Sequence, residues 1–320
     1  MHAENADDAA KGFLCIAGGS FTIGAHGDAI SASGQLQIDG GSYALTAGGG
    51  SESATMKAGD TMQRPGFRDF SSAVASLDAA DAAEDTASCK GIKADGTLTV
   101  NGGNFDLNTA DDAVHSGADV TITGGEWTIR TGDDCIHADA AVIIQTGRFT
   151  ISDCYEGVEG QSVTIHGGTL DITARDDGIN AAGGADGSGT AYGFGRQDPF
   201  AVDDSCAITI NGGEITIVSD GDCLDSNGSL TINGGTLKLS CSGNGNTAID
   251  SNGAYANNGG SITTNDGSES GTGGMGSGRG SMGGGRGGMG GEKPFGAEKA
   301  GGAGMPREPG QQRPMPGAAA

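Results

Sequence analysis

The feature that most constrains this chain is an internal repeat of about 22 residues. The motif DDAVH at residues 111–115 returns as DDCIH at residues 133–137. Between the two copies lie two short segments of alternating apolar and polar residues, VTI and WTI, with a Gly-Gly pair between them. Such alternation indicates β-strands, and a fixed period of this length is typical of a solenoid in which each repeat stacks on the next.

The repeat can be followed over most of the chain by the position at which its first strand begins. These positions are Leu14, Leu36, Leu98, Val120, Val142, Val163, Ile208 and Leu230. Five of the seven steps between them are 21 or 22 residues, and the other two are 62 and 45 residues. We therefore expect two insertions, at about residues 49–88 and 183–205, which form loops on the coil.

Apolar residues also recur at fixed distances within each repeat. Seven residues after the first-strand position stand Phe21, Tyr43, Phe105, Trp127, Phe149, Leu170, Ile215 and Leu237. Two residues further on, every repeat has Ile or Leu. Because alternate residues of a strand share one face, both sets are predicted to stack inside the fold. Trp127 is therefore predicted to be a core residue rather than a platform for sugars.

These patterns predict an all-β fold, a right-handed parallel β-helix of about 22-residue rungs over residues 1–265. Residues 1–3, Met-His-Ala, match the middle of a rung at residues 136–138. We therefore expect the β-helix to be N-terminally truncated, with a signal peptide upstream. Residues 266–320 are rich in Gly, Met and Pro without apolar periodicity, so we expect a disordered tail.

The negative charge is concentrated in the repeat region. The chain has 17 Lys and Arg against 41 Asp and Glu. Six of these basic and three of these acidic residues lie beyond residue 270, which leaves 11 basic and 38 acidic residues in the repeats. A body with a net charge of about −27 repels phosphate backbones and attracts cations, so nucleic acid is not an expected partner. No stretch of about 18 apolar residues occurs, so no membrane span is expected.

The seven cysteines follow neither a CxxC spacing nor a Cys/His metal pattern. Cys135 and Cys223 each precede a core aliphatic residue and stand about three rungs apart, roughly 14 Å at the strand spacing of a sheet. That distance is too long for a disulfide. We expect both to be buried free thiols. One disulfide between two of the other cysteines is left open as a possibility.

A column of acidic residues follows the second strand of the repeats. Fourteen residues after the first-strand position stand Asp28, Asp112, Asp134, Glu156, Asp177 and Asp222. Lys90 takes this position in the rung before Asp112, with Lys93 three residues on. Carboxylates on neighbouring rungs are expected about 4.8 Å apart, where they repel by about 3.5 kcal/mol at an effective dielectric constant of about 20. Raised pKa values, local divergence, Lys90 or bound cations must offset this repulsion.

Calcium is the cation that this pattern favours, because it takes about six to eight oxygen ligands in loose geometry. His115 and His137 stand singly among oxygen donors, which makes zinc the less favoured metal. The alternative is a solvated turn in which Asp before Gly or Ala only supplies turn chemistry. The candidate calcium ligands are Asp111, Asp112, Asp133, Asp134, Glu156, Glu159, Asp176, Asp177, Asn180, Asp222 and Asp225.

Five segments carry a resemblance to a known family: CKGIKADGTLTVNGG, ADDAVHSGADVTITGG, CYEGVEGQSVTIHGG, ARDDGINAAGG and NTAIDSNG. They resemble the secreted bacterial carbohydrate-binding parallel β-helix family over about residues 2–265. Cys135 and Cys223 depart from the small residues of that family. The resemblance implies a pectate-lyase-like fold, bound Ca²⁺, and binding of cellulose or acidic sugars outside the bacterial cell or on its surface.

We therefore expect a monomer that binds a polysaccharide in a calcium-dependent, non-catalytic way, either cellulose or an acidic pectin-like glycan such as polygalacturonate. An acidic face binds uronic-acid polymers best when calcium bridges carboxylates on both sides. Neutral glucans need hydrogen bonds and exposed rings instead. Tyr192, Phe194 and Phe200 in the second insertion are the candidate carbohydrate-binding rings, and a packed loop is the alternative for them.

Two other functions stay open. A polysaccharide lyase of the pectate type would use calcium to acidify the proton beside a uronate carboxylate, and a basic side chain would abstract that proton. Lys90 and Lys93, beside the rung of Asp111 and Asp112, are the candidate catalytic bases. The third hypothesis is a structural β-helical surface adhesin whose repeats only form a long rod.

Overall fold

The computed structural model describes residues 1–5, 7–8, 11–54, 88–182, 201–243 and 245–270, and these form an all-β fold of parallel strands, as predicted. They include two short 3-10 helices, η2 (Ser51–Ser53) and η3 (Ser268–Ser270). No helix in this part of the chain is long and apolar enough to cross a membrane. The central parts of both insertions and the predicted tail beyond residue 270 lie outside the described residues.

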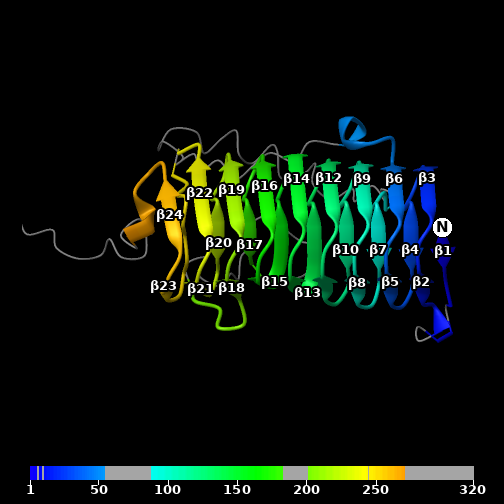
Figure 1. Ribbon diagram of the computed structural model, residues 1–320, viewed down its shortest axis with the longest axis horizontal. Coiled ribbons are helices and arrows are strands. Elements are labelled where there is room, and N and C mark those ends of the chain that lie inside the picture. Colours follow the sequence, from blue (N-terminus) through cyan, green and yellow to red (C-terminus); the bar gives the residue numbers. More distant parts are fainter. Residues whose placement is uncertain (6, 9–10, 55–87, 183–200, 244, 271–320) are drawn as a thin grey trace, which may run out of the picture. The chain divides into compact units, whose positions relative to one another are not determined.

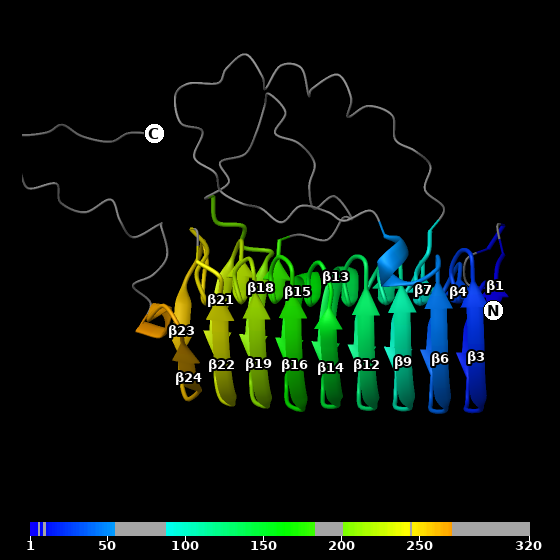
Figure 2. The same cartoon turned by 90° about the horizontal axis from the view of Figure 1, so that it is seen from above.

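The strands lie in three parallel rows, which follow one another along the chain (Figures 1 and 2). Row 1 holds the predicted first strands: β2 (Leu14–Ile16), β5 (Leu36–Ile38), β8 (Leu98–Val100), β11 (Val120–Ile122), β18 (Ala207–Ile210), β21 (Ser229–Ile232) and β23 (Tyr255–Asn257). Row 2 follows the Gly-Gly turn: β3 (Ser20–Ala25), β6 (Ser42–Ala47), β9 (Asn104–Thr109), β12 (Glu126–Thr131), β14 (Arg148–Asp153), β16 (Thr169–Ala174), β19 (Glu214–Ser219), β22 (Thr236–Cys241) and β24 (Ser261–Thr264).

Row 3 follows the acidic turn: β1 (His2–Ala3), β4 (Ile30–Ala32), β7 (Ile92–Ala94), β10 (Val114–Ser116), β17 (Ile179–Ala181) and β20 (Leu224–Ser226). Two longer strands, β13 (Ile136–Ile144) and β15 (Val158–Ile165), pass through row 3 and then row 1. They join these two rows into one sheet, while row 2 forms a second sheet among the described residues.

The register of the repeats is the one that the sequence predicts. Leu36 pairs with Leu98 across the step of 62 residues, and Val163 pairs with Ile208 across the step of 45 residues. Each strand therefore lies beside its counterpart in the next repeat even where an insertion separates the two. The pairing of the strands on either side of each predicted insertion is therefore unchanged.

The core is built from the columns that the repeat predicts. In row 2 the aromatic rings of the predicted column stack on one another, with centroids 4.8 Å apart between Tyr43 and Phe105 and 3.8 Å apart between Phe105 and Trp127. Phe149 continues the stack at 5.6 Å from Trp127. Trp127 is only 1% exposed, which confirms that it is a core residue.

Row 3 is the part of the fold that the sequence reasoning missed. The alternating pattern identifies only the two segments that form rows 1 and 2, and it assigns no strand after the acidic residues. The structure has a third strand, in which Ile136 and Ala138 face the core and His137 lies between them. In the sequence, the third strand is marked only by an apolar residue and a small residue two positions apart. This pattern is too short to identify a strand unless the neighbouring repeats are compared.

The Gly-Gly turn between rows 1 and 2 requires glycine at its second position. Gly168 has a φ of 100°, which L-residues with a side chain rarely adopt. A Cβ atom there would lie 2.6 Å from the carbonyl oxygen of Gly147 in the previous repeat. The stacking distance between repeats therefore leaves no room for a side chain at this turn.

All seven cysteines are free thiols in this structure. Cys135 and Cys223 are completely buried, as predicted. Each lies in the chain between the acidic turn and the core residue of row 3 that follows it.

Candidate metal centre

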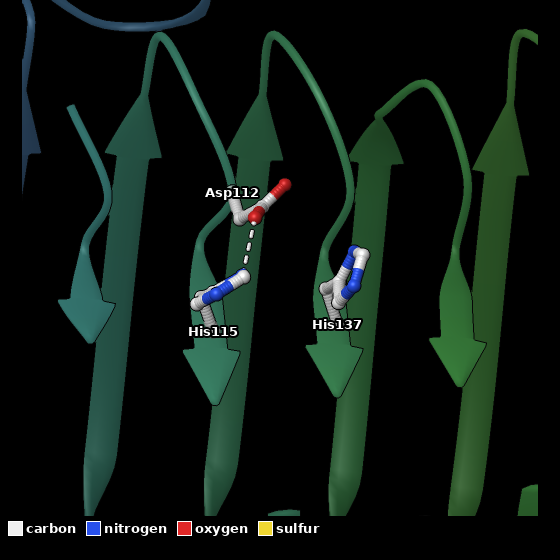
Figure 3. A group of neighbouring side chains, drawn as sticks. All are labelled: Asp112, His115 and His137. Atoms are coloured by element: carbon white, nitrogen blue, oxygen red, sulfur yellow. Dashed lines mark hydrogen bonds and ion pairs between the residues drawn. The ribbon is translucent and has the colours of Figure 1, made fainter. Parts of the chain in front are cut away.

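The acidic column lies in the turn that leads from row 2 into row 3. Asp133 and Asp134, for example, stand between the end of β12 and the start of β13. Because strand residues alternate, the residue three positions after each column position faces away from the aliphatic core. His137 at this position is nevertheless completely buried, and His115 is 8% exposed. Figure 3 shows Asp112 on its turn, with His115 and His137 on neighbouring strands.

Column carboxylates bind the backbone of the next repeat. One oxygen of Asp112 accepts a hydrogen bond from the backbone N–H of Asp134 at 3.1 Å, and one oxygen of Asp134 accepts the equivalent bond from Glu156 at 3.1 Å. The same type of bond runs from Lys90 to Asp28, from Asp222 to Asp177 and from Thr247 to Asp222. An acid recurs at this position because its carboxylate accepts a hydrogen bond from a backbone N–H that would otherwise lack a partner. This hydrogen bond within the turn explains why the column recurs. It uses only one oxygen of a carboxylate and leaves the other oxygen to be accounted for.

The second oxygen of the column carboxylate turns toward the residue three positions on. Asp112 Oδ2 lies 2.9 Å from His115 Nδ1, and Asp134 Oδ2 lies 3.4 Å from His137 Nδ1. An imidazole at this position can donate a proton to the second oxygen. An ionised carboxylate at this position cannot, so the repeats differ in how the negative charge of the column acid is balanced.

Lys90 neutralises one end of the column. Its Nζ lies 2.7 Å from Asp111 Oδ1 and 2.7 Å from Asp112 Oδ2. Burial alone would lower the pKa of Lys90, but the charges of these two carboxylates hold it well above its usual value. An ammonium group held in this way cannot accept a proton, which argues against Lys90 as the base of a lyase. Lys93 is partly exposed, with Nζ 3.6 Å from Asp95 Oδ1.

His115 and His137 are neighbours, which corrects the expectation that the histidines stand singly. Their backbones pair in register between β10 and β13, and their ring centroids are 5.0 Å apart. His137 Nδ1 also lies 3.0 Å from Glu159 Oε2. Burial would lower the pKa of His137, but the hydrogen-bonded carboxylates of Asp134 and Glu159 raise it to about 11. The donor set here contains nitrogen and is not the oxygen-only set expected from the sequence.

The middle of the column has buried acids with few donors. Glu156 is 3% exposed, and both of its oxygens accept hydrogen bonds from Asn180 Nδ2, at 3.2 and 3.0 Å. Burial and the neighbouring carboxylates raise the pKa values of Glu156 and Asp177 well above their ordinary range. Asn180 Oδ1 is buried and accepts no hydrogen bond from the described residues. Asp176, beside Asp177, is also buried.

At the C-terminal end of the column three aspartates meet. Asp222, Asp225 and Asp250 each offer an oxygen within 4.8 Å of the others, and all three are half-buried. Asp225 stands where a histidine stands in other repeats, so Asp222 receives no imidazole donor. Burial and the repulsion among these acids raise the pKa of Asp222 to about 8 and that of Asp225 to about 7. We refer to these three residues as the aspartate cluster.

In the metal-free protein, the melting temperature is expected to fall as the pH rises from about 5 to about 8. Asp222 and Asp225, with pKa values raised to about 8 and about 7, bind a proton more tightly in the folded protein than in the unfolded chain. Stability is therefore lost as the pH rises from the unfolded pKa of about 4 through the raised values. Calorimetry in a chelating buffer checks this, and Asp225→Asn should flatten the dependence. A melting temperature that rises over this range would contradict the prediction.

The predicted carbohydrate-binding rings, Tyr192, Phe194 and Phe200, lie outside the described residues. On the described surface, a shallow hollow of about 390 Å³ lies on the outward side of row 2, over β3, β6, β9 and β12. The outward side chains along it are polar or small: Ser20, Thr22, Ser42, Ala44, Asn104, Asp106, Glu126 and Thr128. The rings below it belong to the core stack, in which Tyr43 and Phe105 are buried and Phe21 is half-buried, so this surface offers mainly hydrogen-bonding groups.

Asp250 is the residue of the aspartate cluster that the sequence reasoning missed. It stands 25 residues after Asp225, because Leu230 pairs with Tyr255 and this last described repeat is longer than the others. The available signal was the segment NTAIDSNG, in which Ile249 pairs with Leu224 of row 3. The residue after Ile249 then takes the position equivalent to Asp225.

Comparison with known proteins gives a match to a family model. Residues 1–135 and 133–271 match the model of a protein family described as "Carbohydrate-binding domain-containing protein". No curated protein and no solved structure matches the chain.

Proposed function

The chain belongs to this family of carbohydrate-binding domain-containing proteins, and on that premise we propose that it binds an acidic polysaccharide through calcium without cleaving it. The observation that carries the proposal is the aspartate cluster of Asp222, Asp225 and Asp250, whose oxygens lie within 4.8 Å of one another. Calcium takes about six to eight oxygen ligands, and carboxylates are among its preferred donors. Three half-buried carboxylates provide part of that number and leave positions open toward solvent.

An acidic glycan fits the open positions better than a neutral one does. The repeat region has 38 acidic and 11 basic residues, so a polyuronate is repelled unless a cation lies between the two. A calcium ion held by the aspartate cluster can take carboxylate oxygens of the glycan as its remaining ligands. Binding of polygalacturonate is then expected to require calcium.

Cellulose is the second candidate ligand, and a different surface favours it. The hollow on row 2 is lined by hydroxyl, amide and carboxylate side chains that can donate and accept hydrogen bonds. It lies over the N-terminal repeats, whereas the aspartate cluster belongs to the C-terminal repeats. Cellulose bound in this hollow would be retained equally with calcium and with a chelator.

We infer further that the three rows close into a right-handed parallel β-helix. Every pairing between neighbouring repeats is parallel in the described residues, and the chain passes through rows 1, 2 and 3 in the same order each time. Connections between parallel strands of one sheet are almost always right-handed. In such a coil the acidic column runs along one edge, with the half-buried aspartate cluster at its C-terminal end.

We also propose that the protein acts outside the cell. Calcium sites of extracellular modules have dissociation constants of about 10⁻⁴ to 10⁻³ M, which suits a cluster with few ligands and open positions. Half-buried aspartates such as Asp225 and Asp250 form a site of this kind. At intracellular calcium levels such a site would stay largely unloaded.

The proposal predicts that Asp225→Asn abolishes calcium-dependent retention on polygalacturonate. The substitution keeps the size of the side chain and removes one charge from the aspartate cluster, so calcium affinity should fall at least about tenfold. Pull-down with polygalacturonate, with calcium or a chelator, measures retention, and calorimetry measures calcium affinity. Asp171→Asn on the exposed side of β16 is the matched control and should behave as wild type. Equal retention of both variants, or retention in chelator, would refute the calcium bridge.

The same incubation separates binding from cleavage. A lyase would release unsaturated oligosaccharides, which absorb in the ultraviolet, whereas the proposed binding protein releases none. Lys93 is the remaining base candidate because it is partly exposed, with a carboxylate 3.6 Å away. Product formation that disappears in Lys93→Ala would establish the lyase. If the protein neither releases product nor is retained on polygalacturonate, the structural adhesin is the hypothesis that remains.

A further inference from the structure

A second group of ligand-type side chains lies on three neighbouring repeats, outside the aspartate cluster. His115, His137 and Asp112 each offer a ligand atom within 4.8 Å of the others, and so do Asp134, His137 and Glu159. Figure 3 shows the first of these two sets. We call the five residues together the histidine cluster. His137 belongs to both sets and stands at its centre.

The distances within each of the two sets suit a small ion beside His137, the residue that they share. His137 Nδ1 lies 3.4 Å from Asp134 Oδ2 and 3.0 Å from Glu159 Oε2, and His115 Nδ1 lies 2.9 Å from Asp112 Oδ2. Ligand atoms bound to one tetrahedral ion, with bonds of about 2.1 Å, are about 3.4 Å apart. Hydrogen bonds give similar distances, so a second observation is needed to point to an ion.

That observation is the shortage of protons around His137. Its Nδ1 can carry one proton, yet two carboxylates approach this nitrogen, from Asp134 and Glu159. Glu159 is 4% exposed, and its Oε2 is buried and lacks a hydrogen bond of good geometry. A cation between Nδ1 and the two carboxylates would satisfy all three groups, and a proton satisfies only one pair.

The other nitrogen of His137 is placed as it is in metal-bound histidines. His137 Nε2 is buried and lies 3.5 Å from Asp139 Oδ1. A histidine that binds a metal through one nitrogen commonly directs the other toward a carboxylate, which orients the ring. Asp139 can take this role when Nδ1 faces the ion.

We propose that the histidine cluster binds one divalent transition-metal ion of the zinc class. Imidazole nitrogen suits zinc, copper, iron and nickel, whereas calcium prefers oxygen ligands alone. The ligands come from the repeats of β10, β13 and β15, so the ion joins three neighbouring repeats. Because His137 is completely buried and Glu159 is 4% exposed, this ion stabilises the fold and does not contact the glycan.

The test uses the full chain, without a purification tag, after removal of metals by a chelator. Co²⁺ is added in the presence of excess Ca²⁺, and its visible absorption reports nitrogen and oxygen ligation. One Co²⁺ per chain is expected, displaced by Zn²⁺ and not by Ca²⁺. His137→Gln and His115→Gln should each lower the affinity at least about tenfold. His166→Gln, at an exposed histidine, is the matched control and should bind as wild type does.

The two proposed metals can be separated with crossed variants. Asp225→Asn should lose calcium-dependent retention of polygalacturonate and keep Co²⁺ binding, whereas His115→Gln should do the reverse. If His137→Gln does not fold, His115→Gln and the rise in wild-type melting temperature on adding Zn²⁺ decide the question. The proposal is overturned if Co²⁺ does not bind, if Ca²⁺ displaces it, or if His115→Gln binds it as tightly as His166→Gln does.

Discussion

Trp127→Ala is expected to destabilise the repeat region by about 3–5 kcal/mol, the usual cost of removing a large buried aromatic side chain. The indole is 1% exposed and lies between Phe105 and Phe149, with ring centroids 3.8 and 5.6 Å away. Its Nε1 donates a hydrogen bond to the carbonyl oxygen of Gly124 at 3.3 Å. The substitution therefore opens a cavity in the middle of the aromatic stack and also removes two ring contacts.

Urea unfolding followed by circular dichroism measures the effect of Trp127→Ala, because the chain has no second tryptophan for fluorescence. Each repeat contacts only its neighbours, so a weak central repeat also uncouples the two halves of the stack, and the unfolding transition should broaden. Thr128→Ala, at the exposed next position of β12, is the control and should change stability by no more than about 0.5 kcal/mol. A folded Trp127→Ala of normal stability that has lost glycan binding would show that the indole is a sugar platform after all.

The core could be predicted because its geometry repeats. A period of about 22 residues with alternating apolar positions places Phe105, Trp127 and Phe149 in one column, and the structure stacks them there. The pairing of Leu36 with Leu98 was also predictable, because strand register depends on the apolar face and not on the length of an insertion. Row 3 was missed because three residues such as Val114–Ser116 carry too little alternation to identify a strand.

The spacing of the acids predicted that they stack, but not what each of them contacts. Spacing alone showed that Asp112 and Asp134 are stacked, but it could not show that each holds the backbone N–H of the following repeat. It also could not show which way a side chain points. His115 and His137 looked isolated along the chain, although they are adjacent across it, with centroids 5.0 Å apart. Asp250 was missed because the longer last repeat moves it out of the common period.

The structure shows how one turn motif serves repeats with different needs. In repeats such as those of Asp112 and Asp134, one oxygen of the column acid accepts a hydrogen bond from a backbone N–H of the next repeat. The residue three positions on then lies beside the other oxygen. With His115 it is an imidazole, and with Asp225 it is a second carboxylate. A change at that single position therefore alters the surroundings of the second oxygen without altering the turn.

Lys90→Met is expected to cost about 3–5 kcal/mol, because it leaves two carboxylates without their cation in a buried site. Lys90 Nζ lies 2.7 Å from Asp111 Oδ1 and 2.7 Å from Asp112 Oδ2, and Asp112 is 1% exposed. Burial alone would raise the pKa of Asp112, but the hydrogen bond from His115 and the charge of Lys90 hold it below its ordinary value. This stabilisation is present above the unfolded pKa of about 4 and is lost as the pH falls through the lowered value. On the alkaline side the raised pKa of Lys90 keeps the pair intact up to at least about pH 10.

Thermal unfolding of Lys90→Met at neutral pH measures this cost, with Lys93→Met as the control. Lys93 is partly exposed and lies 3.6 Å from Asp95, a pair worth no more than about 1 kcal/mol. Adding Asp112→Asn to Lys90→Met removes the charge that the first substitution leaves unpaired. The double variant should therefore be less destabilised than the sum of the two single variants, by more than about 1 kcal/mol. Strict additivity would mean that Lys90 and Asp112 do not stabilise each other, and that the acidic turn tolerates a buried carboxylate by other means.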